Sequence, residues 1–176
     1  GDKRSNDNRV SLARNFSFGW VLQGEPGDYD YSGPSPASEL ETQLIEAWLS
    51  AHSDCLCYLD YHNTGYSDRE ITYFAASKNT EYEQTLKNAY LTAIGKLSGI
   101  WYGKYKIPES QVLGYTGHFD NLASPQRYAY SLNIPSMSLE TTWQAIGDGR
   151  KYGPITNAIT TEYLGNLLVE LTKHLE

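Results

Sequence analysis

The sequence predicts an α/β fold, a three-layer α/β/α arrangement around a mixed, mostly parallel sheet. Short apolar runs of strand length alternate with longer amphipathic segments of helix length, which is typical of this class. The 176 residues are enough for one domain with a real core, so we expect residues 1–176 to form a single domain. Polar residues also close two of the apolar runs, as expected where strands end at a site.

The first 35 residues are rich in Gly, Pro, Asp and Tyr and read as loop, with a short strand near 10–12. Ser38 and Glu41 have the spacing of a capping box, which predicts that a helix starts there. One stripe of this helix is apolar, and we expect it to face the core. Its members are Leu40, Leu44, Ile45, Trp48 and Leu49.

The middle of the chain alternates between the two kinds of segment. Residues 55–61 and 71–75 read as strands, and a long helix begins near Thr80, where Glu83 completes a second capping box. Residues 112–115 fit a further strand, and residues 117–127 read as a loop.

The final third of the chain predicts a strand over 134–140, a turn-rich loop over 147–154 and a closing helix from about 157 to 175. The apolar positions that this helix should turn inward are Ile159, Tyr163, Leu167, Leu168 and Leu171.

Composition excludes some functions. The formal net charge is -7, from 14 Lys and Arg against 21 Asp and Glu, and no basic run is present, which argues against a nucleic-acid partner. No apolar stretch approaches the roughly 20 residues that span a bilayer, so no membrane partner is expected. Nothing in the sequence identifies a cellular compartment.

Three separated polar residues are candidates for chemistry. Arg14 lies between apolar neighbours, His62 follows a predicted strand 48 residues later, and Glu140 ends another strand 78 residues beyond it. A guanidinium can hold a carboxylate through two hydrogen bonds, an imidazole can bind zinc, and a carboxylate can act as a general base. Each residue in isolation also fits an ordinary structural or surface role.

The surroundings of these residues resemble the zinc carboxypeptidase family of metallopeptidases. Residues 4–16 read Arg-Ser-Asn-Asp-Asn-Arg-Val-Ser-Leu-Ala-Arg-Asn-Phe, in register with the family's Arg-x-Asn-x-Asn-Gly-Val-Asp-Leu-Asn-Arg-Asn-Phe. Residues 31–42 resemble its Tyr-x-Gly-x-x-Pro-x-Ser-Glu-x-Glu-Thr element. Residues 59–62 and 136–140 look like the strands that end in the family's third zinc ligand and its catalytic glutamate.

The resemblance implies a role for each matching residue. His62 would bind zinc, the implied cofactor, and Glu140 would activate the attacking water. Arg4 would polarise the scissile carbonyl and hold the oxyanion, and Arg14 would grip the carboxylate of a peptide or acylated amino-acid substrate. Tyr115 is the candidate for the family's mobile substrate-capping tyrosine.

Two departures from the family pattern concern the site. The family's His-x-x-Glu pair of zinc ligands belongs upstream of Arg4, so the chain resembles the C-terminal part of the catalytic domain, incomplete at the N-terminus, and should be inactive alone. Ala13 replaces an asparagine that helps to bind the terminal carboxylate. A catalytically inactive peptide-binding pseudo-enzyme and a zinc deacylase of N-acyl amino acids therefore remain alternatives. An incomplete sheet should also leave apolar surface exposed, which predicts self-association or a retained N-terminal segment.

Overall fold

The computed structural model describes residues 5–64, 71–75, 85, 88–89, 92, 101–102, 105–106, 117–118, 123–142 and 165–173. The chain divides into two compact units. The first comprises residues 1–60 and 118–136, and the second comprises residues 61–117 and 137–176. None of the helices within the described ranges is long and apolar enough to cross a membrane.

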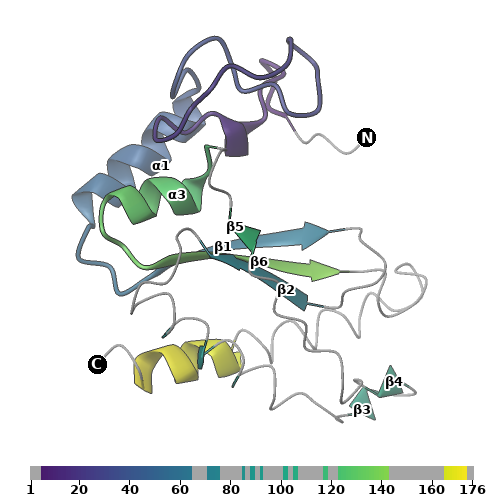
Figure 1. The fold of residues 1–176 in the computed structure, drawn as a ribbon, viewed down its shortest axis with the longest axis vertical. Helices are drawn as coiled ribbons and strands as arrows, with labels where there is room; N and C mark the ends of the chain where they lie inside the picture. The colour runs from purple at the N-terminus through teal and green to yellow at the C-terminus, as the bar shows by residue number, and fades with distance from the viewer. Residues whose placement is uncertain are drawn as a thin grey trace. The chain divides into compact units, whose positions relative to one another are not determined.

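The first unit has its core where two helices meet. Helix α1, Leu40–Ala51, packs against helix α3, Pro125–Ser131 (Figure 1). Leu49, Ala129 and Ile134 form a fully buried cluster there, with four partly buried residues packed around it: Cys55, Tyr58, Tyr128 and Leu132.

Helix α3 corrects the sequence interpretation, which assigned residues 117–127 to a loop. Ser124 is its N-cap, accepting a hydrogen bond from the Arg127 N–H, and Pro125 occupies the first helical turn. A proline there loses no hydrogen bond and has its φ angle already set for a helix. The Ser-Pro pair was therefore a helix-start signal rather than a sign of loop.

Helix α1 has the predicted position but not the predicted cap or burial. The residue before Leu40, Glu39, is the N-cap, and no side-chain hydrogen bond closes the first turn, so the Ser38–Glu41 capping box is wrong. Of the predicted apolar stripe only Leu49 is buried. The members that are exposed are Leu40, Leu44, Ile45 and Trp48.

The main sheet has four strands in the order β1-β6-β2-β5. Their bounds are Tyr58–Thr64, Ser136–Thr142, Ile71–Ala75 and Gly117–His118 in that order. The arrows of β1 and β6 point the same way (Figure 1), whereas β2 pairs with β6 antiparallel, so the sheet is mixed. The predicted strand at 71–75 is confirmed, and those at 55–61 and 134–140 are shifted by two or three residues.

Two short strands, β3 (Trp101–Tyr102) and β4 (Tyr105–Lys106), form a separate antiparallel pair. The prediction that the helix from Thr80 extends to Trp101 is therefore wrong. Residues 85, 88–89 and 92 are helical, inside the helix predicted from Thr80. The strand predicted at 112–115 and the loop at 147–154 lie outside the described residues. The three-layer arrangement stays a prediction.

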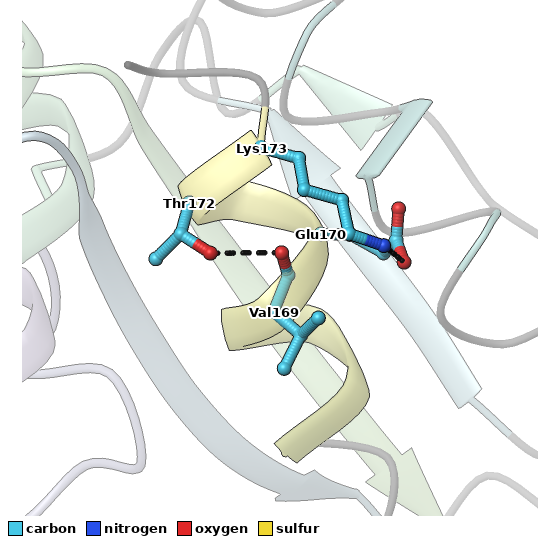
Figure 2. Close-up of polar contacts among 4 residues, drawn as sticks. All are labelled: Val169, Glu170, Thr172 and Lys173. Carbon is cyan, nitrogen blue, oxygen red and sulfur yellow. Dashed lines mark hydrogen bonds and ion pairs between the residues drawn. The ribbon is translucent and has the colours of Figure 1, made fainter.

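The described part of the closing helix is residues 165–173. Leu167 and Leu171 are buried as predicted, but Leu168 is exposed, because it lies about 100° around the helix from its neighbour. Figure 2 shows two local contacts on this helix. Lys173 Nζ lies 2.9 Å from Glu170 Oε1, and the Thr172 hydroxyl donates to the Val169 carbonyl at 2.9 Å.

Candidate functional site

Arg14 ends a single turn of 3-10 helix, Leu12–Arg14. The strand predicted near 10–12 is wrong, because residues 10–11 belong to no regular element and Leu12 starts this turn. The turn is closed by the Arg14 N–H, which donates to the Ser11 carbonyl, and by the Asn15 N–H, which donates to the Leu12 carbonyl. Arg14 Nε lies 3.3 Å from Asp30 Oδ1, in an ion pair in which the arginine side chain is 16% exposed and the aspartate 46%. The chain thus presents a largely covered guanidinium beside a carboxylate.

The residue after Arg14 fixes this turn in place. Asn15 is completely buried. Its Oδ1 accepts from the Glu39 N–H at 3.1 Å, and its Nδ2 donates to the Ser32 carbonyl at 2.8 Å and to Ser38 Oγ at 3.0 Å. One amide therefore ties its own turn both to Ser32 and to the adjacent Ser38 and Glu39, because an asparagine side chain can donate and accept at once.

Gly33 makes room for this amide. Its φ angle is +86°, and a Cβ atom there would lie 2.6 Å from both Asn15 Nδ2 and Ser38 Oγ. No L-residue with a side chain could occupy the position without moving both polar groups. The glycine of the Tyr-x-Gly element thus has a steric reason.

Glu39 is a buried carboxylate that completes the network. Its Oε2 accepts from Asn6 Nδ2 and Asn8 Nδ2, each at 2.7 Å, and its Oε1 accepts from Ser38 Oγ at 2.8 Å. Burial raises the pKa of the Glu39 carboxyl, but the hydrogen bonds from Asn6, Asn8 and Ser38 outweigh burial, so the pKa lies below its ordinary value. The carboxylate stays ionised and holds residues 6–8 against the start of α1.

The other two candidates belong to the second unit. His62 lies on β1 and is half-buried, and Glu140 lies on β6, the strand next to β1 in the sheet. Glu140 is opposite Thr72 in the β2–β6 register. The fold therefore brings an imidazole-bearing strand and a carboxylate-bearing strand side by side, although 78 residues separate them in sequence.

The predicted site residues fall in different parts of the chain. His62 and Glu140 share a sheet, whereas Arg14 lies in the first unit. Arg4 and Tyr115 lie outside the described residues. Sequence reasoning missed Asp30, Asn15 and Glu39. Asn15 and Glu39 lie inside the segments that match the family pattern, so the sequence could have indicated them. Asp30 lies in an irregular loop outside those segments, and nothing in the sequence indicated it.

The described residues do not fit a catalytic zinc ion by themselves. Catalytic zinc typically takes three protein ligands. Within the described ranges no group of three His, Cys, Asp or Glu side chains could hold a metal ion, and His62 is the one candidate ligand that the sequence offers. A complete zinc site would therefore need ligands from further residues.

Comparison with known proteins identifies the family of the chain. The zinc carboxypeptidase family profile matches residues 2–163. Carboxypeptidase A from Helicoverpa armigera is similar in structure, with a TM-score of 0.61 and 18% identity, over 92% of this chain and 42% of that one. Bovine thrombin-activatable fibrinolysis inhibitor, solved with a tick carboxypeptidase inhibitor, gives a TM-score of 0.64 and 15% identity, over 93% of this chain and 57% of that one.

The chain therefore spans about half the length of the solved structures that it resembles. At these identities the structural likeness shows the fold, which is carboxypeptidase-like. A search of curated sequences found no match. The match to the family profile covers residues 2–163, which is most of the chain, and on that ground the chain belongs to the zinc carboxypeptidase family.

Proposed function

We propose that the complete protein is a zinc-dependent carboxypeptidase-type metallopeptidase that cleaves a peptide or amide bond, and that this chain supplies part of its site. The observation that carries the proposal is the position of His62 and Glu140 on neighbouring strands of one sheet. The family membership supports the reaction class. In the complete protein His62 would be one of several ligands to zinc, which would supply Lewis-acid chemistry when bound.

Glu140 acts in this proposal as the general base. It takes a proton from the water whose oxygen attacks the scissile carbonyl carbon, and it returns that proton to the nitrogen as the C–N bond breaks. The products are a carboxylic acid and an amine, so atoms and charge balance. Arg4 is proposed to stabilise the oxyanion formed in between, and Tyr115 to cover the substrate.

Arg14 is proposed to bind the carboxylate at the end of the substrate. Its guanidinium is a fixed cation, and its planar set of N–H donors matches a carboxylate. The position before it is alanine, so the methyl group of Ala13 donates no hydrogen bond to the same carboxylate. Selection of a free terminus then depends on Arg14 and on the groups that hold it.

The test uses the full-length gene product that carries this chain. Metal analysis should find zinc, and a blocked dipeptide with a free carboxylate should be hydrolysed. Glu140→Gln should lower kcat by about 10²- to 10⁴-fold, the range that general-base catalysis contributes. Glu25→Gln, at an exposed carboxylate, is the matched control and should leave kcat unchanged.

The possible outcomes separate the alternatives. Turnover of N-acyl amino acids but not of peptides would identify a deacylase. Peptide binding with neither zinc nor turnover would identify a pseudo-enzyme. Full peptide turnover in Glu140→Gln would contradict the proposed role of this residue.

A further inference from the structure

Arg14 needs an orienting group if it is to bind a carboxylate selectively. It extends from a single turn of 3-10 helix, and the side chain of its neighbour Ala13 has no polar atoms. A long, flexible arginine loses side-chain entropy when it binds, and a contact that fixes it beforehand reduces that loss. Asp30 makes such a contact, because its Oδ1 lies 3.3 Å from the buried Nε of Arg14, in an ion pair that acts through charge and not through a hydrogen bond.

Backbone hydrogen bonds hold the segment that carries Asp30 close to the turn that carries Arg14. The Tyr31 carbonyl accepts from the Ser11 N–H at 2.8 Å, and the Tyr31 N–H donates to the Asp28 carbonyl at 3.2 Å. Ser32, completely buried, exchanges bonds with Gln23: its N–H donates to the Gln23 carbonyl at 3.1 Å, and its Oγ accepts from the Gln23 N–H at 2.9 Å. Asp30 therefore lies in a loop that these hydrogen bonds hold beside the start of the 3-10 turn.

The Asp30–Arg14 contact contributes little to folding, because ion pairs with an exposed partner add little to stability. Its geometry matters more. It places a negative charge against Nε, at the stem of the planar group, and so favours one orientation of the guanidinium. An asparagine at position 30 would have nearly the same size and shape but would remove the negative charge on which the ion pair depends.

We infer that Asp30 is the positioning residue for Arg14, doing from a different loop what the polar neighbour missing at position 13 cannot do. The inference rests on the proposed function in one respect, that Arg14 binds the substrate carboxylate. It also names the specificity: substrates with a free terminal carboxylate depend on Asp30, and substrates whose terminus is an amide do not.

The test compares Asp30→Ala and Asp30→Asn in the full-length protein, with Glu25→Gln as a charge control on the same loop. N-acetyl-leucine is the probe, and N-acetyl-leucinamide is its uncharged counterpart. Asp30→Ala should weaken N-acetyl-leucine binding by about tenfold, because the guanidinium loses its fixed orientation. Asp30→Asn should weaken it in the same direction, because the charge of the ion pair is lost. Glu25→Gln should stay within about threefold of the original protein, and amide binding should not change in any variant.

A second measurement follows Arg14 directly. The Nε–Hε signal of Arg14 in ¹⁵N-resolved NMR should exchange slowly with water in the original protein and in Glu25→Gln, and faster in Asp30→Ala and Asp30→Asn. Unchanged exchange in Asp30→Ala would overturn the inference, as would unchanged affinity for N-acetyl-leucine. If exchange changes as expected but no protein prefers the carboxylate probe to the amide, the positioning of Arg14 stands, and its proposed role in substrate binding fails.

Discussion

The segment before Leu40 and the helix that begins there differ in which side chains they bury. Residues 5–39 bury polar side chains, and the buried set includes Ser11, Asn15, Ser32 and Glu39. Helix α1 exposes large apolar ones, namely Leu40, Leu44, Ile45 and Trp48. The polar groups inside are tolerated because hydrogen bonds replace those they lose to water.

The difference shows that hydrophobicity alone did not decide burial in this unit. The position of Arg14 depends on the conformation of this loop. The hydrogen bonds of the Asn15–Glu39 network fix that conformation. The helix needs only one buried apolar residue, Leu49, to join its neighbour α3. Three substitutions test this contrast.

Asn15→Ala should have the largest effect. It leaves the Glu39 N–H and the Ser32 carbonyl buried without their partner, which should lower the free energy of unfolding by about 3 kcal/mol. Urea unfolding followed by tryptophan fluorescence measures this loss. Gln43→Ala, which removes one exposed bond to the Ala37 carbonyl, is the control and should cost less than about 1 kcal/mol. Equal losses in both variants would contradict the importance of the buried network.

Glu39→Gln should have an intermediate effect that depends on pH. Because the pKa of the Glu39 carboxyl is lowered in the folded state, its stabilisation is present above the unfolded pKa and is lost as pH falls through the folded pKa. The variant should be about 1–3 kcal/mol less stable near neutral pH, and the difference should vanish in strong acid. Unfolding curves measured from neutral to acidic pH give the profile, with Glu25→Gln, at an exposed carboxylate outside this network, as the control. A difference that persists unchanged in acid would count against the charge of Glu39.

Leu44→Gln should have the smallest effect on stability, below about 0.5 kcal/mol, because the side chain is already exposed. Leu49→Ala on the same helix should instead cost about 3 kcal/mol, since it opens a cavity in the core. We propose that the exposed stripe of α1 drives self-association, so light scattering should show Leu44→Gln with a lower average mass than the original protein. A monodisperse monomer in the original protein would show that the stripe does not associate.

The family and the positions of several helices and strands could be predicted from local sequence. The register of residues 4–16 and 31–42 with a known family identified the chain. A short segment of strand length located β2, and an apolar period of 3.6 residues located α1. Local signals failed where two readings competed: Ser124-Pro125 starts a helix although proline suggested a loop, and Ser38 binds Glu39 instead of capping α1.

By itself the sequence determined which residue types and segments are available: the family, the apolar period of the helices and the order Arg14, His62, Glu140. Only the tertiary structure decided which groups meet. It placed β6 next to β1, paired Arg14 with Asp30, and buried Glu39 while leaving Leu44 exposed. The physical reason is that periodicity and propensity act between neighbours in the chain, whereas hydrogen-bond partners, ion pairs and buried faces are set by contacts between distant segments.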